Sequence, residues 1–516
     1  MKLLAAASAL LCGLGAVAQD FENPVLWHDL ADLEVIRVND TFYYTASTMH
    51  YSPGAPILRS YDLVNWEYAG HSVPVLDFGP EYDLDGGNAY VGGIWASTLE
   101  YRESNGLFYW LGCMRTGQTH IYTSPTPEGP WERITILDSC YYDAGMLVDD
   151  DDRIYVAYGN GEISVAELSE DATEEVSTQP VYTWSEDGTV EGSRFYNVDG
   201  TYYIVVTKPA TSEYVLKSTS GPFGPYEIQV LADAVSSPVY GGGNPHQGGL
   251  IDTANGDWYY MAFIDAYPGG RIPALAPITW TDGWPVLELV DGGWGLNYPV
   301  PSVSGGGTVK PPTGDDTFNG TSLGPEWEWN HNPDNEGWSV NNGLVLNTVS
   351  VTDDIYAARN TLTHRILGPS STGTIALDYS NMADGDRAGL VLLRDLSGWI
   401  GVVKEGDSVR VAMVDSIEMD TSWATINTGN EVDSADISGG SGEIWLQISA
   451  NIAPDSDHLA TFSYSTDGSS FTPLGSSFEM KTEWEFFMGY RFGIFNFATI
   501  ATGGSVGVSQ FTLAAN

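Results

Sequence analysis

The chain has 516 residues and is strongly acidic, with 68 Asp and Glu against 20 Lys and Arg and a formal net charge of -48. A field of this sign repels nucleic acid and anionic lipid, so neither is an expected partner. An uncharged partner is favoured, and 17 Trp and 29 Tyr make sugars attractive candidates, although most of these aromatics are expected to fill the space between structural elements.

The N-terminal residues 1–18 predict a secretory signal peptide. A basic start at Lys2 is followed by an apolar stretch too short to span a bilayer, and small residues precede Gln19. No later stretch is apolar enough to span a membrane. We therefore expect a secreted, extracellular protein, by default a monomer, and a length of this kind predicts two domains.

Secretion into an oxidising compartment would permit a disulfide and N-glycosylation. Cys12 lies in the predicted signal peptide, so two cysteines remain. Cys113 and Cys140 are either joined by a disulfide or buried as two thiols in neighbouring repeats. Asn39 and Asn319 are candidate glycan acceptors.

Residues 19–303 contain one short phrase five times, a polar pair followed by aromatic and apolar residues. The phrases occupy residues 39–44, 105–110, 151–156, 199–204 and 255–260, and their second turn residues lie 66, 46, 48 and 56 positions apart. Asn-Gly and Asp-Gly pairs accept the positive φ of a tight hairpin turn, and aromatic residues favour strands. The spacing predicts a five-bladed β-propeller.

Counting back eight to ten residues from each turn selects a set of polar residues. It reaches Asp32, Asp143, Glu191 and His246 in repeats one, three, four and five, whereas the second repeat has Trp95 near this offset. Because the first strand of every blade lines the central channel, these side chains are expected to converge. The alternative for any single acid is a turn cap or a solvated loop residue, but three at equivalent positions are harder to explain in that way.

After the repeats the pattern changes twice. Residues 304–314 form a Gly- and Pro-rich stretch without periodicity, which predicts a linker. Residues 315–516 contain short alternating runs such as 373–379 and 443–448, with turn signals between them. An all-β, two-sheet sandwich is the expected second domain.

Several stretches resemble glycoside hydrolase family 43. In the propeller they are residues 31–38, 142–151, 190–194, 246–250 and 270–273, and in the sandwich they are residues 329–334, 359–363 and 489–497, which are similar to fungal two-domain arabinofuranosidases of this family. The chain departs from many members at Leu33, where they have Pro after the catalytic base.

The resemblance implies a function. The expected activity is removal of α-L-arabinofuranosyl side chains from arabinoxylan, with preference for O3-linked arabinose on doubly substituted xylose and with arabinan as a second substrate. It also implies a concanavalin-like fold for the sandwich.

The resemblance further implies an inverting mechanism with three acids. Asp32 is the expected general base on water, Glu191 the general acid, and Asp143 orients Glu191 and raises its pKa as a nearby negative charge. Inversion requires the base and acid carboxyls to stand about 6.5 to 9.5 Å apart.

The other expected site residues have structural alternatives. His246 resembles a channel histidine that contacts a cation through water, so a structural calcium is compatible with it, as is a simple hydrogen-bonded histidine; no cofactor is required. Arg271 resembles an arginine beside the sugar, with a structural salt bridge as the alternative. Trp27, Trp95 and Tyr142 are expected in the pocket wall, and Trp484 is expected to reach the propeller mouth from the sandwich, with core packing as the alternative for Trp95.

Three other functions compete with this reading. β-Xylosidase and arabinanase activities would need only different loops around the same acids, and a non-catalytic carbohydrate-binding propeller would need no acids. The presence of all three acids argues against the last.

Overall fold

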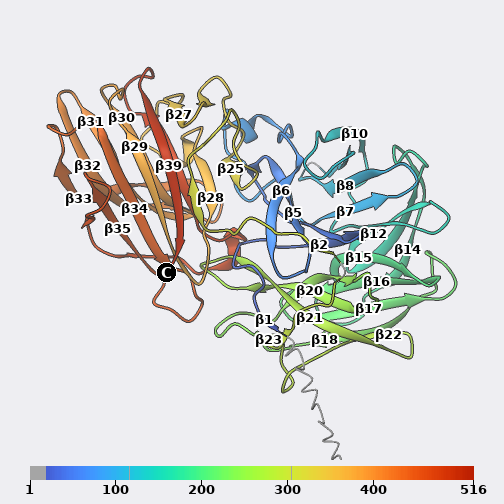
Figure 1. Ribbon diagram of the computed structural model, residues 1–516. Helices are drawn as coiled ribbons and strands as arrows, with labels where there is room; N and C mark the ends of the chain where they lie inside the picture. The colour runs from blue at the N-terminus through green and yellow to red at the C-terminus, as the bar shows by residue number, and fades with distance from the viewer. Residues whose placement is uncertain (1–18, 116, 304) are drawn as a thin grey trace, which may run out of the picture.

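Five four-stranded antiparallel sheets follow one another between residues 34 and 287, and a two-sheet sandwich follows them. The computed structural model describes residues 19–115, 117–303 and 305–516 (Figure 1). The predicted signal peptide, 1–18, lies outside the described residues. The predicted all-β fold class, a five-bladed propeller and then a concanavalin-like sandwich, is confirmed.

The five repeated phrases form the hairpin turns between the first and second strands of the blades. Asn39, Gly106, Asp152, Gly200 and Gly256 all have positive φ at these turns. Positive φ is what a tight hairpin demands and what Asn, Asp and Gly tolerate best. The turn chemistry therefore fixes the start of every blade.

Each blade runs from its innermost to its outermost strand in chain order. The strands are β2 (Glu34–Val38), β3 (Thr41–Thr45), β5 (Gly54–Ser60) and β6 (Trp66–Val73) in blade 1; β7 (Ser97–Arg102), β8 (Leu107–Cys113), β9 (Thr119–Ser124) and β10 (Glu132–Leu137) in blade 2; β11 (Gly145–Val148), β12 (Ile154–Asn160), β13 (Glu162–Leu168) and β14 (Glu175–Thr183) in blade 3; β15 (Glu191–Val198), β16 (Thr201–Lys208), β17 (Ser212–Ser218) and β18 (Glu227–Asp233) in blade 4; and β19 (His246–Asp252), β20 (Trp258–Asp265), β21 (Arg271–Thr281) and β22 (Trp284–Leu287) in blade 5.

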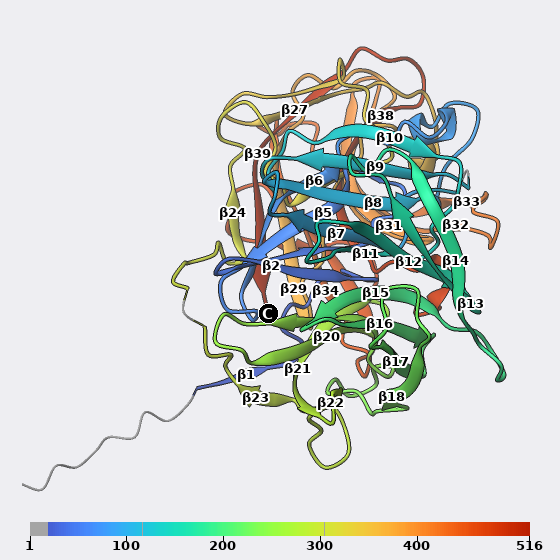
Figure 2. The same ribbon diagram turned by 90° about the vertical axis from the view of Figure 1, so that its right-hand side faces the viewer.

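The innermost strands pack against one another in a ring around the axis. β2 contacts β7, β7 contacts β11, and β11 contacts β15 (Figure 2). β15 contacts β19, and β19 contacts β2 and so closes the ring. β1 (Asp20–Glu22) pairs with β23 (Asn297–Pro299), so the two ends of the propeller segment are joined outside the blades. The ring of inner strands thus brings together equivalent positions at the starts of these strands, as the repeat predicts.

A disulfide joins Cys113 to Cys140.

The sandwich consists of a nine-stranded and an eight-stranded sheet. The first contains β24 (Gly314–Asp316), β26 (Trp338–Val340), β27 (Leu344–Asn347), β29 (Ser370–Asp378), β34 (Glu443–Asn451), β35 (Leu459–Ser465), β36 (Thr472–Pro473), β37 (Phe478–Glu479) and β39 (Ser505–Ala515). The second contains β4 (Tyr51–Ser52), β25 (Trp327–Asn330), β28 (Leu362–Arg365), β30 (Asp386–Leu393), β31 (Leu396–Glu405), β32 (Ser408–Met419), β33 (Thr425–Asp436) and β38 (Arg491–Ala498).

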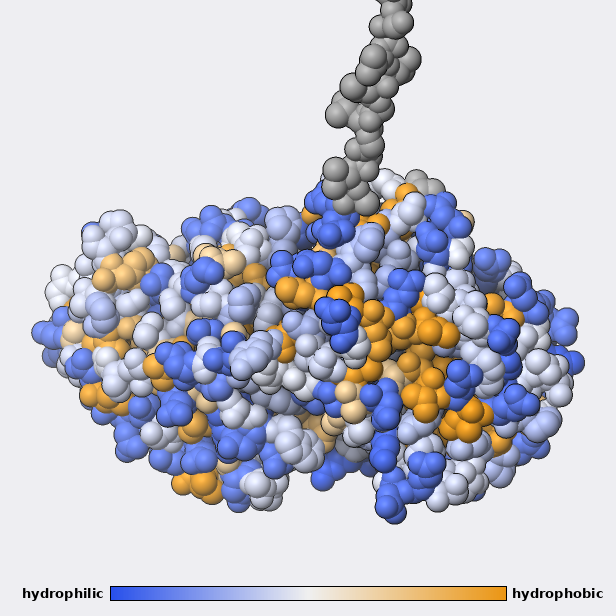
Figure 3. All heavy atoms as spheres, turned by 90° about the horizontal axis from the view of Figure 1, so that it is seen from below, coloured by the Kyte–Doolittle hydropathy of each residue, from blue (hydrophilic) through white to orange (hydrophobic). Residues whose placement is uncertain are grey.

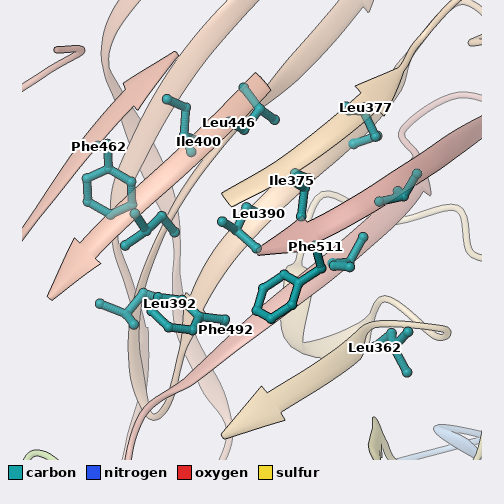
Figure 4. Packing of buried hydrophobic residues seen from close by; sticks show 14 of the residues in the cluster. Leu362, Ile375, Leu377, Leu390, Leu392, Ile400, Leu446, Phe462, Phe492 and Phe511 are labelled. Atoms are coloured by element: carbon teal, nitrogen blue, oxygen red, sulfur yellow. The ribbon is translucent and has the colours of Figure 1, made fainter. Parts of the chain in front are cut away.

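A continuous apolar core lies between these two sheets. Ile375, Leu390, Leu446 and Phe492 are completely buried in it, and Figure 4 shows their side chains packed between strands of both sheets. Alternating apolar residues along β29 and β34 face this core, which is the pattern the sequence predicts.

The two domains share a strand and a buried cluster of charges. β4 belongs to the propeller segment but pairs with β25 of the sandwich. Beside it, Glu328 accepts hydrogen bonds from Arg365 at 2.9 Å and from Arg491 at 2.5 Å, and none of these three side chains is appreciably exposed. Two contacts join this sandwich cluster to the propeller segment, because Arg365 Nε donates to the carbonyl of Asp29 at 2.8 Å and His71 Nε2 contacts Glu328 Oε1 at 3.0 Å.

The predicted linker lies against the first blade. The backbone N–H of Lys310 donates to Glu67 at 2.7 Å, and β24 begins at Gly314, so the last residue of the predicted linker already belongs to the sandwich sheet. Asn39 and Asn319 are exposed.

The surface is mostly polar. Seen from below in Figure 3, hydrophilic residues cover most of the face, and apolar residues gather on the propeller half. Exposed apolar residues occur in the segment that leads from β22 to β23, among them Leu289, Val290 and Leu296. Within the ranges described, no helix has the length and apolar character needed to cross a bilayer.

Candidate active site

A pocket of about 730 Å³ lies where the inner strands of all five blades begin. Its walls come from the propeller, around Asp32, Trp95, Asp143, Glu191 and His246, and from a sandwich segment that spans residues 482–487. The repeat offset therefore selected one residue of this pocket from every blade. The predicted convergence of the three acids and the channel histidine is what the structure shows.

The backbone has an unusual conformation where the chain enters the inner strands. Asp32 and Asp143 have φ of 55° and 50°, Gly192 follows Glu191 with φ of 69°, and Gln247 follows His246 with φ of 46°. The left-handed region is costly for residues with a Cβ and is kept where surrounding contacts enforce it. Four blades thus share one local kink at the residue that enters the pocket or beside it.

Asp32 is buried and held by two side chains. Its Oδ1 accepts a hydrogen bond from Arg271 Nη1 at 2.8 Å, and its Oδ2 accepts one from Ser47 Oγ at 2.6 Å. Arg271 is itself fixed, because its Nε donates to the carbonyl of Phe487 at 3.0 Å and its backbone N–H donates to Asp29 at 2.8 Å. The base predicted from sequence is therefore oriented by contacts from both domains.

Glu191 has a different environment. Asn160 Nδ2 donates to its Oε2 at 2.6 Å. Burial raises the pKa of the Glu191 carboxyl, the negative charge of Asp32 raises it further, and a hydrogen bond from Tyr142 lowers it. A carboxyl that keeps its proton to higher pH is suited to act as a general acid.

Asp143 interacts electrostatically with Glu191. Burial raises the pKa of Asp143 well above its usual value, and the charges of Glu191 and Asp32 add to this effect. The carboxyls of Asp143 and Glu191 therefore compete for protons in one buried site. Burial and the charge of Asp32 also raise the pKa of Glu191, and because repulsion between two carboxylates acts on both, a charge on Asp143 would favour the protonated form of Glu191.

His246 lines the pocket without a metal-binding partner set. Its Nδ1 contacts the carbonyl of Asn244 at 2.9 Å, its Nε2 lies 4.0 Å from Asp265, and burial lowers its pKa. Calcium prefers six to eight oxygen ligands. No group of three or more His, Cys, Asp or Glu side chains in the described parts of the chain could hold a metal ion, so a calcium ion beside His246 would have to take most of its ligands from water or backbone carbonyls. The hydrogen-bonded channel histidine is the alternative that the contacts support.

The aromatic residues expected in the pocket wall divide into two groups. Trp95, Tyr142 and Trp484 line the pocket, with Trp484 57% exposed. Trp27 does not line it. The Trp27 side chain packs against the cores of both domains, and its carbonyl accepts a hydrogen bond from Gly368 N at 3.0 Å. Trp27 was predicted in the wall because it lies only five residues before Asp32. The prediction is wrong because the Trp27 side chain packs between the two domains instead.

Sequence reasoning missed Ser47 and Asn160, which donate to the acids, and Phe487, whose carbonyl holds Arg271. Ser47 lies two residues after β3, Asn160 is the last residue of β12, and Phe487 lies in the sandwich directly after the 3-10 helix η3 (Trp484–Phe486). Ser47 and Asn160 share only a position near the end of the second strand of a blade, and no local sequence motif marks either residue. The aromatic cluster around Trp484 pointed to the segment of Phe487 but not to its carbonyl.

The site therefore brings together two carboxyl groups with different partners in one water-accessible pocket. Asp32 is paired with a guanidinium group, whereas Glu191 accepts hydrogen bonds from neutral donors. Pairs of carboxyls whose environments differ in this way can divide acid and base roles in glycoside hydrolysis.

Comparisons with known proteins agree with this chemistry. Residues 21–285 match the model of the glycosyl hydrolases family 43, and residues 315–513 match a β-xylosidase C-terminal concanavalin A-like domain. A solved structure of a GH43 glycoside hydrolase, engineered in its active site to display both endo-xylanase and exo-arabinofuranosidase activity, is 47% identical with a TM-score of 0.94, over 96% of this chain and 100% of that one.

Two curated relatives carry different activities in their names. A β-xylosidase of Formosa agariphila is 29% identical over 95% of this chain and 89% of its own length. The non-reducing end α-L-arabinofuranosidase BoGH43B of Bacteroides ovatus is 27% identical over 78% of this chain and 79% of its own length. The extent of the family match and the geometry of the three acids lead to one conclusion: this chain is a glycoside hydrolase and belongs to glycosyl hydrolase family 43.

Proposed function

We propose that the protein is a secreted enzyme that removes α-L-arabinofuranosyl side chains from arabinoxylan by an inverting single displacement. The observation that carries this proposal is the presence of Asp32, Asp143 and Glu191 in one pocket of a family 43 propeller. The relative at 47% identity, whose description includes exo-arabinofuranosidase activity, supports the choice of sugar.

In the proposed reaction Glu191 and Asp32 act on opposite sides of the glycosidic bond. Glu191 donates its proton to the leaving oxygen, while Asp32 removes a proton from a water molecule that attacks the anomeric carbon. Arg271 and Ser47 hold the Asp32 carboxylate in the orientation that this step needs. The products are arabinose of inverted anomeric configuration and a xylan chain with a free hydroxyl group where the arabinose was attached.

The charge of the pocket favours a neutral sugar. Asp265 and Glu483 join the three acids in its lining, and Arg271 is the cation among the residues that line it. A sugar acid would bring a further negative charge into this field, so uronic acid substituents fit poorly. Arabinofuranose carries no charge.

Trp484 supports the finer choice of a branched substrate. Its exposed ring stands at the edge of the pocket and makes an edge contact with Phe487, with ring centroids 5.3 Å apart. An aromatic face at this place can stack on a sugar of the main chain beside the branch point. We therefore propose doubly substituted xylose as the preferred branch point, with O3-linked arabinose removed and arabinan side chains as a second substrate.

Secretion is part of the proposal as well. The disulfide between Cys113 and Cys140 supports it, because disulfides persist mainly in oxidising compartments. We propose that the enzyme acts as a monomer and has the same activity as the fungal two-domain arabinofuranosidases.

A β-xylosidase is the second candidate, and one observation favours it: most of the curated relatives carry xylosidase in their names. The same acid pair would serve that reaction. Arabinanase activity would require an open groove rather than a pocket.

Analysis of released sugars separates these candidates. The wild type is incubated with singly and doubly substituted arabinoxylan oligosaccharides, and we expect free arabinose from the doubly substituted unit. Xylose as the main product would replace the proposal with β-xylosidase activity, and longer oligosaccharides would indicate an endo-acting enzyme.

The role of Asp32 is checked in the same assay. Asp32→Asn keeps the size of the side chain but removes the base, and we expect the rate to fall by at least about 10³-fold. Asp151→Asn, at an exposed hairpin turn, is the matched control and should leave the rate unchanged. Equal activity of Asp32→Asn and the wild type would rule out this base.

A further inference from the structure

The guanidinium group of Arg194 lies completely buried beneath the pocket and touches backbone of three blades. Its Nη2 donates to the carbonyl of Asp32 at 2.7 Å, and its Nε donates to that of Leu33 at 2.8 Å. Its Nη1 donates to the carbonyls of Ala144 at 3.0 Å and Ser193 at 2.7 Å. Each of these carbonyls belongs to a catalytic acid or to a residue one or two positions after one.

We propose that Arg194 is a positioning residue that fixes the three catalytic carboxyls relative to one another. The inference deepens the proposed function and rests on it only in taking Asp32, Asp143 and Glu191 as the reacting groups.

The conformation of the chain gives this contact its importance. The kinks at Asp32 and Asp143 place both residues in the left-handed region, which Asp tolerates better than most residues with a Cβ but which is still less favourable than the right-handed region. Arg194 binds the carbonyl groups at these kinks or beside them. Asp143 is also tied to the same strand, because its carbonyl accepts a hydrogen bond from Ser193 N at 2.9 Å.

Close packing leaves Arg194 little freedom. A Cβ atom at Gly145 would lie 2.6 Å from the Arg194 Cα and 2.7 Å from the carbonyl oxygen of Ser193, so only glycine lets blades 3 and 4 approach in this way. Because the guanidinium group binds the carbonyls of Leu33, Ala144 and Ser193, its movement would be transmitted directly to the starts of β2, β11 and β15.

Glu34 in the first blade and Thr98 in the second extend the network around Arg194. Glu34 Oε2 lies 3.3 Å from Arg194 Nε and accepts a hydrogen bond from Thr98 Oγ1 at 3.1 Å. Thr98 Oγ1 also accepts a hydrogen bond from Met146 N at 2.9 Å. The network around Arg194 thus connects blades 1 to 4 below the pocket.

Lysine cannot replace this arrangement. Arginine presents five N–H donors in a planar fork, whereas lysine has three donors on one nitrogen atom and cannot reach carbonyls on opposite sides. Arg194→Lys therefore separates the effect of the planar guanidinium geometry from the effect of the positive charge.

The test combines Arg194→Met with Glu34→Gln, so that no unpaired charge stays buried. On the 4-nitrophenyl glycoside that the wild type cleaves, we expect kcat to fall by about 100-fold, since small misplacement of reacting groups has effects of this size. KM should change much less, and the pH limbs of kcat/KM should move because the surroundings of the acids change. Arg194→Lys, which keeps the charge, should also lose most of its activity.

Arg102 provides the matched control. It is a buried arginine that connects blades 2 and 3 through Asp152 and the carbonyl of Glu170, away from the pocket. Arg102→Met should lower the thermal stability but leave kcat and the pH profile as in the wild type. A double variant that is less stable yet has wild-type kcat and pH limbs would overturn the proposal, as would full activity of Arg194→Lys.

Crystal structures keep the inference separate from the proposed function. In Arg194→Met/Glu34→Gln the separation of the Asp32 and Glu191 carboxyls should change from that in the wild type, whichever sugar is released. An unchanged separation would overturn the inference. Release of a sugar other than arabinose by the wild type would contradict the proposed function alone.

Discussion

Asp32 and Glu191 show how neighbouring carboxyls acquire different roles. Arg271 and Ser47 hold Asp32, whereas Glu191 is partly buried among neutral donors and has a raised pKa. The difference comes from partners rather than residue type, which is how one pocket can hold both an acid and a base.

Tyr142→Phe tests the protonation of Glu191. The hydroxyl of Tyr142 lowers the pKa of Glu191, so its removal should raise that pKa and move the alkaline limb of kcat/KM to higher pH. The pH profile of the purified variant is the measurement. Tyr158→Phe, whose hydroxyl contacts Thr178 on the outer side of blade 3, should keep the wild-type limb. An alkaline limb that stays in place or moves to lower pH would contradict this assignment.

The residues predicted from sequence were those that a repeated offset could mark. Asp32, Asp143, Glu191 and His246 stand at equivalent places, and Arg271 was found by its resemblance. Trp27 has no such repeat and was misplaced. Ser47, Asn160 and Phe487 could not be predicted, because their contacts form only when separate strands or domains come together.

Among the structural elements, too, some could be predicted from the sequence and others could not. All five turns were predicted, because tight turns are encoded by adjacent residues. The pairing of β4 with β25 and of β1 with β23 was not predicted, since these strands are only two to four residues long and their partners lie more than 270 residues away. The short 3-10 helix η3 (Trp484–Phe486) was predicted to reach the pocket and does so, although it belongs to the other domain.

Trp484→Ala tests the contribution of this segment to substrate choice. The loss of one stacking surface should lower kcat/KM on branched arabinoxylan by roughly 10-fold, with little effect on a 4-nitrophenyl arabinofuranoside that has no xylan main chain. Because the ring is more than half exposed, thermal stability should stay close to that of the wild type. Tyr240→Ala removes an even more exposed aromatic outside the pocket and is the control. An equal effect on both substrates would contradict a main-chain contact.

At the scale of the whole molecule, two of the many acidic residues are buried and influence how stability depends on pH. Glu34 and Glu213 are buried in the propeller, and burial raises the pKa of each to about 7. Such groups keep their protons in the folded protein at pH values where the unfolded chain has lost them. Their contribution to the free energy of unfolding is therefore larger in acid than at neutral pH.

Glu34→Gln tests this linkage. Between pH 4.5 and about 7 the folded wild type retains the Glu34 proton that the unfolded chain has released, so its free energy of unfolding falls as pH rises. The variant lacks this group, and its stability relative to the wild type should rise across the window by on the order of 3 kcal/mol. Denaturant unfolding at a series of pH values is the measurement, with Glu22→Gln at the exposed strand β1 as the control. Parallel curves for Glu34→Gln and the wild type would contradict the assignment.

The identity and anomeric form of the first product test the central claim most directly. Proton NMR of the reaction with a doubly substituted arabinoxylan oligosaccharide, recorded before mutarotation, reports both. We predict that β-L-arabinofuranose appears first, because single displacement inverts the α-linkage. First appearance of the α-anomer, or of xylose in place of arabinose, would contradict the account.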